Sequence, residues 1–115
     1  MSLFSERERQ RLSDIVDNAD AIAEYIAGFD AAAFGTDRKT VDAVERCLMR
    51  ISEAVVHIGA ARMALVSPTL SEVDVRGLGN FLRHEYYRVD LLTIYNTAAE
   101  DVPALRASCV AALER

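Results

Sequence analysis

The stretch VDAVERCLMRISEAVVHI, residues 41–58, decides the fold class of this chain. Its apolar side chains recur at steps of three and four residues, and the series continues to residue 65. The members are Val41, Val44, Leu48, Ile51, Val55, Ile58 and Leu65. This spacing places one apolar stripe along a helix. We therefore expect a long amphipathic helix that ends at Ser67-Pro68, because the residue before a proline disfavours helical backbone.

A second stripe precedes the first and predicts its antiparallel partner. Its members are Leu12, Ile15, Ala19, Ile22, Ile26 and Phe29. Ser5 can cap this helix, with acidic residues following in the first turn. The expected helix spans about 5–28, and a connection over 29–36 leads to a helix start at Thr36-Asp37 or Thr40.

The remaining segments also favour helices. Asp90 is a plausible cap for a helix over about 90–99, and Pro103 stands in the first turn of a last helix, a position that suits proline. Leu105, Cys109 and Leu113 share one face of that last helix. No segment alternates apolar and polar residues as a strand would. We predict an all-α fold: a single domain, residues 1–115, folded as an up-and-down bundle of four main helices plus a shorter C-terminal helix.

Composition and net charge restrict the classes of function that we expect for this chain. The chain has 115 residues, 51% of them apolar, and a net charge of −5. This charge argues against a generic nucleic-acid binder, which relies on a basic surface, so we expect any RNA contact to be local. No stretch reaches the roughly 20 apolar residues of a membrane-spanning helix, and the first residues lack the features of a signal peptide. We expect a cytoplasmic protein that does not insert into a membrane.

Isolated cysteine and histidine residues do not predict a metal site. Neither Cys47 nor Cys109 has a second ligand at metal-binding spacing, and each is expected to be a small core residue. His57 lies beside the apolar stripe and is expected to be partly buried. Arg62 interrupts that stripe. We expect no cofactor and no metal.

The polar residues concentrate in RGLGNFLRHEYYRVD, residues 76–90. On a helix over about 72–86, positions 76, 80, 83, 84 and 87 fall within one arc of about 100°. Apolar side chains at 78, 81 and 82 fall on the opposite side. Two glycines, Gly77 and Gly79, weaken this helix and indicate close approach of another backbone. One face would pack, and the other would present guanidinium groups, an amide, an imidazole and a phenol.

This set of groups can perform a specific reaction. Arginine suits a phosphate, and histidine moves protons at neutral pH. Together they can cleave RNA without a metal, with the 2′-hydroxyl of the RNA as the nucleophile. The alternative is that these residues form the ordinary solvated face of a helix.

The stretch resembles the signature of the HepT-like proteins, a branch of the HEPN superfamily. The family motif is commonly Arg-Asn-x-x-x-His-x-Tyr, and here Asn80, His84 and Tyr86 match it. Gly79 stands in the place of the motif arginine, whereas Arg76 and Arg83 lie nearby. The segment Ile-Ser-Glu-Ala at 51–54 is similar to a second family segment, Ile-Gly-Glu-Ala.

The resemblance implies a toxin of a two-gene toxin–antitoxin system, acting as a metal-independent RNase and as a homodimer with the motif in a cleft between subunits. It implies His84 as catalytic acid or base, Asn80 as an orienting residue and Arg76 or Arg83 as the group that stabilises the phosphorane. Its expected partner is a cognate minimal nucleotidyltransferase antitoxin that silences it by attaching AMP to Tyr86.

Four alternatives remain open. The departure at Gly79 fits a catalytically inactive helical adaptor or binding partner of a nucleotidyltransferase. Glu53 either reaches the polar face of the motif helix or is simply solvated, and Tyr86 either accepts AMP or packs its ring. A small-molecule site within the bundle ranks last, because the apolar stripes offer no polar anchors.

Overall fold

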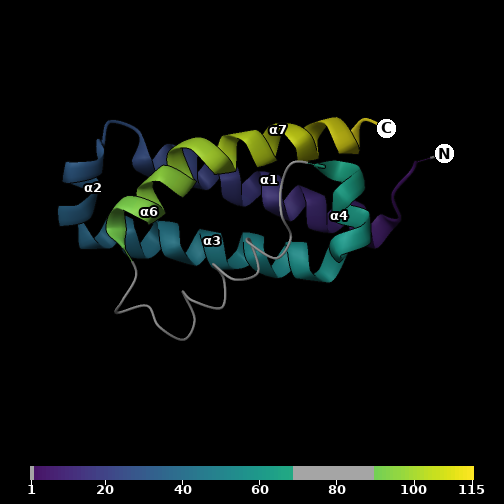
Figure 1. Ribbon diagram of the computed structural model, residues 1–115, viewed down its shortest axis with the longest axis horizontal. Helices are drawn as coiled ribbons and strands as arrows, with labels where there is room; N and C mark the ends of the chain where they lie inside the picture. The colour runs from purple at the N-terminus through teal and green to yellow at the C-terminus, as the bar shows by residue number, and fades with distance from the viewer. Residues whose placement is uncertain (1, 69–89) are drawn as a thin grey trace.

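The computed structural model describes residues 2–68 and 90–115, and within those ranges every regular element is a helix. This confirms the predicted all-α fold. Figure 1 shows three long rods, α1, α3 and the run from α6 to α7, lying side by side along the long axis. The described elements are α1 (Glu6–Ile26), α2 (Ala31–Thr36), α3 (Arg38–Ile58), α4 (Ala60–Val66), α6 (Leu91–Asn96), the π-helical η2 (Thr97–Asp101) and α7 (Val102–Leu113).

The start of α1 has the predicted cap. The Ser5 side chain accepts a hydrogen bond from the Glu8 backbone N–H at 3.1 Å, and the Glu8 carboxylate accepts one from the Ser5 N–H at 2.8 Å. This reciprocal pair satisfies two of the free N–H groups of the first turn. The helix ends at Ile26, before Gly28 with φ of +83°, so the predicted range of 5–28 is confirmed to within two residues.

The connection predicted over 29–36 contains a short helix, α2, so that prediction was wrong. Asp30 caps it by accepting from the Ala33 N–H at 2.8 Å, and three alanines favour helical backbone. The fully buried Phe34 ring fixes α2 against Tyr95 of α6, with ring centroids 5.5 Å apart. The Tyr95 hydroxyl also donates to the Phe29 carbonyl at 2.8 Å.

The long helix predicted to reach Ser67 is divided in two. Its first part, α3, begins after Asp37, which accepts from the Thr40 N–H at 3.1 Å, as one of the two predicted starts requires. It stops at Gly59, whose φ of +86° is left-handed and is readily adopted only by glycine. The chain then turns into α4, and Leu65, predicted to be buried, is 43% exposed.

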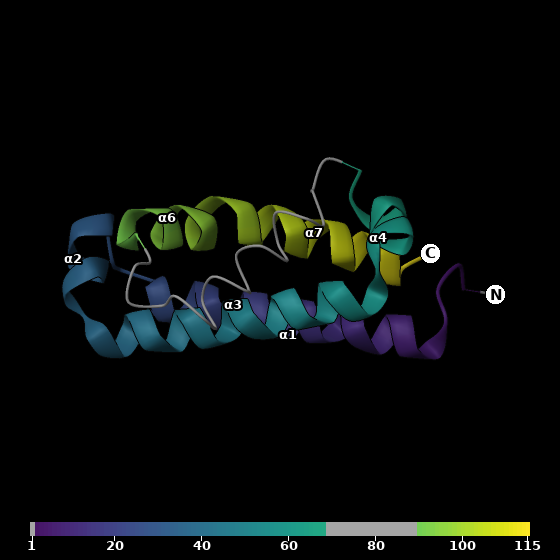
Figure 2. The same ribbon diagram turned by 60° about the horizontal axis from the view of Figure 1, so that its bottom comes forward.

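The core lies between α1, α3 and α7, as Figures 1 and 2 show from two sides. The stripes predicted for α1 and α3 are buried up to Ile22 and Ile58, whereas Ile26 and Phe29 are only partly buried. The predicted core role of Cys47 and Cys109 is confirmed, since both are buried and unpaired. One apolar core is therefore shared by the long helices.

The two helices predicted over 90–99 and from 103 form one helical run with a wide turn inside it. The Val102 N–H donates to the Thr97 carbonyl five residues back, which is the π-helical spacing of η2. The next residue, Pro103, has no N–H to continue an ordinary ladder. The wide turn therefore falls where proline interrupts the hydrogen bonding.

The two ends of the bundle are formed by different elements. Figure 1 shows both chain ends beside α4, and α2 with α6 at the opposite end. The Arg9 guanidinium links the start of the chain to its end by donating to the Leu113 carbonyl at 3.0 Å. No helix within residues 2–68 and 90–115 has the length and apolar content needed to cross a bilayer.

Candidate functional site

The predicted catalytic and modification residues lie outside the described residues. These are Arg76, Asn80, Arg83, His84 and Tyr86, and the predicted helix over 72–86 falls there too. Their roles therefore stay predictions. The structure describes the helical bundle formed by residues 2–68 and 90–115.

The described chain stops at residue 68 before the motif and resumes at residue 90 after it. These two points lie at opposite ends of the bundle (Figure 1). On one side α4 contacts α3 and α7, and its Arg62 reaches Glu8 near the start of α1. On the other side α6 packs beside α2 (Figure 1). Asp90 begins α6, as predicted: its carboxylate accepts from the Leu92 N–H at 3.0 Å and from the Thr93 hydroxyl at 3.1 Å. The second flank of the motif therefore enters the fold through a well-capped helix start.

Arg62 explains the interruption of the predicted stripe. Its guanidinium pairs with Glu8 through Nε at 2.7 Å and a terminal nitrogen at 3.3 Å, and it donates to the Leu3 carbonyl at 2.8 Å. It also lies 5.3 Å from the centroid of the buried Phe4 ring. The residue thus holds α4 against the start of α1.

The same contacts lower the pKa of the Glu8 carboxyl group. The hydrogen bond from Arg62, followed by the Ser5 N–H, lowers the pKa of Glu8 from 4.5 to about 2. Glu8 is therefore a carboxylate held ionised by Arg62, and its charge is largely neutralised by that partner.

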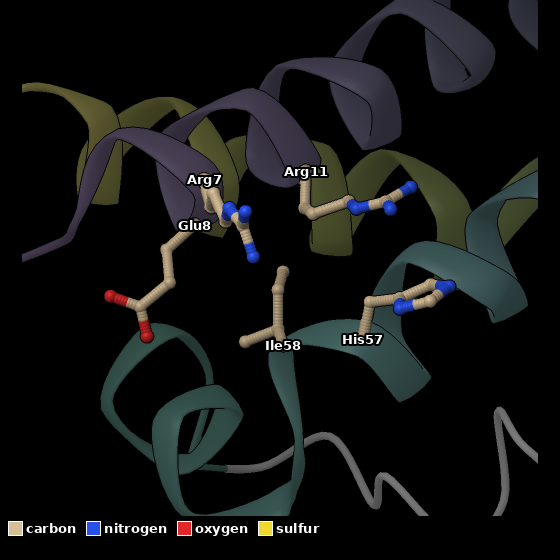
Figure 3. A pocket seen from close by; sticks show the side chains of 5 residues that line it. All are labelled: Arg7, Glu8, Arg11, His57 and Ile58. Carbon is tan, nitrogen blue, oxygen red and sulfur yellow. The ribbon is translucent and has the colours of Figure 1, made fainter.

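A pocket lies between α1 and α3 at this end of the bundle, and Figure 3 shows the side chains that line it. Arg7 and Arg11 come from α1, one turn apart, and His57 comes from the last turn of α3, with Ile58 at the base. The Arg11 guanidinium and the His57 ring extend on the same side, whereas Glu8 points away toward α4. The pocket has a volume of about 160 Å³, which is room for one small anion.

The sequence did not predict this group of residues. His57 was expected to be partly buried, and it is exposed, because position 57 lies on the outward side of α3 next to the buried Ile58. The available signal was the spacing of Arg7 and Arg11, which are neighbours on one helix face. Their proximity to His57 depends on the packing of α1 on α3.

The middle of the exposed face of α3 carries further charges. Arg46, Met49, Arg50 and Glu53 line a second depression. Glu53 is exposed, in agreement with the solvated alternative, and its predicted contact with the motif helix falls outside the described residues. No hydrogen bond or ion pair engages the side chains of Arg46 or Arg50 within residues 2–68 and 90–115.

The cysteines are poor nucleophiles. Burial raises the pKa of the Cys109 thiol to about 12, and burial also raises the pKa of Cys47, partly opposed by Arg50. Since the thiolate is the reactive form, neither group suits covalent catalysis. Across the described ranges, no three His, Cys, Asp or Glu side chains gather as a metal site would require.

Comparison with known proteins assigns this chain to a family. The family model for ribonuclease HepT-like proteins matches residues 15–112, which covers α1 from its middle through nearly all of α7. The chain therefore belongs to the HepT-like ribonuclease family, and the resemblance seen in the sequence is confirmed.

Several curated relatives have related names. A provisionally named RNase of Methanocaldococcus jannaschii, MJ0125, is 30% identical over 95 residues, covering 83% of this chain and 81% of the relative. A second such protein of the same organism, MJ1216, is 30% identical with 83% and 78% covered. The probable ribonuclease HepT of Thermococcus cleftensis is 30% identical with 83% and 86% covered. No solved structure matches the chain.

Proposed function

We propose that this protein is a metal-independent endoribonuclease and the toxin of a two-gene toxin–antitoxin pair. Membership of the HepT-like ribonuclease family is the observation that carries the proposal. In the proposed reaction a ribose 2′-hydroxyl gives up its proton and attacks the adjacent phosphorus, the bond from phosphorus to the 5′-oxygen breaks, and the leaving 5′-oxygen receives a proton. His84 takes the first proton or gives the second, Asn80 orients the reacting groups, and Arg76 or Arg83 stabilises the charge on the phosphorane.

The proposed silencing depends on Tyr86. A cognate minimal nucleotidyltransferase attaches AMP to its hydroxyl, and the added volume and negative charge beside His84 exclude RNA. Intact-mass measurement after expression with and without the partner tests this step. The mass increase of an adenylyl group should appear with the partner and vanish in Tyr86→Phe. An increase that persists in Tyr86→Phe would assign the modification to another residue.

The proposed active form is a homodimer in the cytoplasm. The net charge of −5 makes one motif a poor electrostatic trap for RNA, whereas two motifs in one cleft place their arginines on the same substrate. Light scattering at micromolar concentration should give twice the chain mass. A monomeric mass that persists at concentrations where the protein cleaves RNA would refute the dimer.

The test of activity is cleavage of mixed RNA in excess EDTA by the wild type and by His84→Ala. The account predicts cleavage by the wild type and its loss in the variant, with helical circular dichroism unchanged. Arg76→Gln and Arg83→Gln, made in parallel, identify the acting arginine as the one whose loss lowers the rate more than tenfold.

A second candidate function is a catalytically inactive adaptor for a nucleotidyltransferase. The observation that favours it is Gly79, which stands where the family motif has arginine. The same assay separates the two functions, because an adaptor would leave RNA intact even when mass measurement shows Tyr86 to be unmodified.

A further inference from the structure

We propose that the pocket formed by Arg7, Arg11 and His57 is a phosphate-binding subsite for single-stranded RNA, which continues along the exposed face of α3. This inference rests on the proposed ribonuclease function, because it concerns the substrate of that activity. It adds a binding surface on α1 and α3 that is separate in sequence from the motif at 76–90.

Arg7 and Arg11 have side chains that are available to bind a ligand. Within the part of the chain that the structure describes, neither Arg7 nor Arg11 makes a hydrogen bond or an ion pair. Other arginines of the described chain are engaged: Arg62 by Glu8, Arg106 by Asp20 and Arg38 by Asp42. Two free guanidinium groups beside one pocket are a suitable site for phosphate oxygens.

The local charges of the pocket are dominated by its arginines. Glu8 also lines the pocket, and it would offset the arginines if it were free. Instead it accepts two hydrogen bonds from Arg62 and points toward α4 (Figure 3). Asp14, one turn beyond Arg11, is not among the residues that line the pocket. The pairing of Glu8 with Arg62 therefore leaves Arg7 and Arg11 as the unpaired charges of the pocket among the described residues, in a protein whose overall charge is negative.

The basic residues continue along α3. At 100° per residue, positions 46, 50 and 57 fall within an arc of about 40°. Arg46, Arg50 and His57 are all exposed, so they form one line on the outer surface. Lys39 falls in the same arc about two turns before Arg46, about 27 Å from the level of His57 at 1.5 Å per residue. A line of Lys39, Arg46 and Arg50 that leads to the pocket suits a polymer of phosphates better than a single ion.

The far end of this line offers an aromatic ring. Tyr25 of α1 is 42% exposed and lines a depression together with Lys39 and Thr40. An exposed ring beside a cation is the arrangement on which single-stranded bases stack without sequence preference. This favours RNA over free phosphate as the ligand of the whole surface.

Acidic residues beside this surface should weaken RNA binding. Removing one of them should therefore have the opposite effect on affinity to removing an arginine. Asp42 is paired with Arg38 at 3.7 Å, but Glu53 is exposed beside Arg46 and Arg50. Glu53 would repel a phosphate backbone that follows α3. Replacing it with glutamine should therefore strengthen RNA binding, whereas replacing the arginines should weaken it.

The test uses a fluorescein-labelled, single-stranded 2′-O-methyl RNA of mixed sequence and the full chain. This RNA retains its phosphates but lacks the 2′-hydroxyl nucleophile, so binding is measured by anisotropy without cleavage. R7Q/R11Q should weaken binding by about five- to twentyfold at about 0.1 M salt. It should also reduce the slope of log K against log salt by about 1.4, since each single-strand phosphate contact contributes about 0.7.

The control variant is R38Q/R106Q, which removes the same charge from arginines that are already paired. It should change binding less than twofold, R46Q/R50Q should weaken binding, and Glu53→Gln should strengthen it about twofold. An equal loss in R7Q/R11Q and R38Q/R106Q would overturn the subsite and leave only an effect of net charge. Circular dichroism checks that each variant is folded, and R46Q/R50Q provides an independent test if R7Q/R11Q is not.

Cleavage of ordinary RNA, measured in parallel, separates this inference from the proposed function. If the wild type cleaves RNA and R7Q/R11Q binds and cleaves it equally well, the subsite is refuted and the proposed nuclease function is not. If the wild type binds 2′-O-methyl RNA through Arg7 and Arg11 but never cleaves ordinary RNA, the proposed nuclease function is refuted and the binding surface is retained.

Discussion

The inner and outer faces of α3, a helix of 21 residues, differ in burial and in the role that we assign to them. The inner face buries Val44, Ile51 and Val55 against α1, whereas the outer face exposes Arg46, Arg50 and His57. Apolar periodicity identifies the first set because burial selects for it. The second set has no comparable pattern, because solvent accepts almost any polar residue. Free energy of folding should depend on the inner face, and RNA affinity on the outer face.

The largest expected effect is on the inner face. Ile51→Ala should lower the free energy of unfolding by about 2–5 kcal/mol, because it leaves a cavity in a close-packed core. Urea unfolding measures this loss. Arg50→Gln, one residue away on the outer face, should stay within about 0.5 kcal/mol of the wild type. Similar losses in both variants would mean that the two faces are not functionally distinct.

A second prediction concerns the point where α3 ends. Gly59→Ala should destabilise the fold by about 1–3 kcal/mol, because φ of 86° with ψ of 159° is a backbone conformation that essentially only glycine adopts. The matched control is Gly35→Ala within α2, where a Cβ would meet Leu91 at an ordinary 3.6 Å. That variant should be neutral or stabilise the fold by up to about 1 kcal/mol. Equal thermal stability of the two variants would contradict the role given to Gly59.

A third prediction uses pH to test the ion pair that frees Arg7 and Arg11. The pKa of Glu8 is lower in the folded state, about 2 against 4.5, so its stabilising contribution is present above pH 4.5 and is lost as pH falls toward 2. Glu8→Gln should therefore lower stability near neutral pH and flatten its dependence on pH between those values. Thermal unfolding across that range measures the difference. A profile in Glu8→Gln identical to that of the wild type would contradict the pairing with Arg62.

The smallest expected effect on stability is that of R7Q/R11Q. Because neither guanidinium has a partner within the described residues, their removal should change the free energy of unfolding by less than about 0.5 kcal/mol. Urea unfolding beside the binding assay tests this separation. A loss of more than 1 kcal/mol would show that the arginines have a structural role.

The sequence predicted the parts of the fold that depend on periodicity and caps. The buried positions of α1 and α3, the Ser5 cap and the Asp90 cap were all confirmed. The break at Gly59 was missed, because the apolar spacing continues through it to Leu65 and does not show that one glycine adopts positive φ. The helix at 31–36 was missed because its anchor, Phe34 against Tyr95, joins residues far apart in sequence.

The candidate site divides in the same way. The motif residues at 76–86 are predicted from their order along the chain, which needs no tertiary information, and their roles stay predictions. The Arg7, Arg11 and His57 pocket was not recognised, because it brings together residues 46 positions apart through the packing of two helices. Its charge depends further on Arg62 withdrawing Glu8, which only the folded structure reveals.

The most direct test of the central claim is the rate of RNA cleavage in excess EDTA by protein whose intact mass shows Tyr86 to be unmodified. The account predicts cleavage by the wild type, none by His84→Ala, and a reduced rate in R7Q/R11Q that recovers at saturating RNA concentration. Intact RNA after prolonged incubation with the unmodified wild type would contradict the nuclease and leave a helical binding protein.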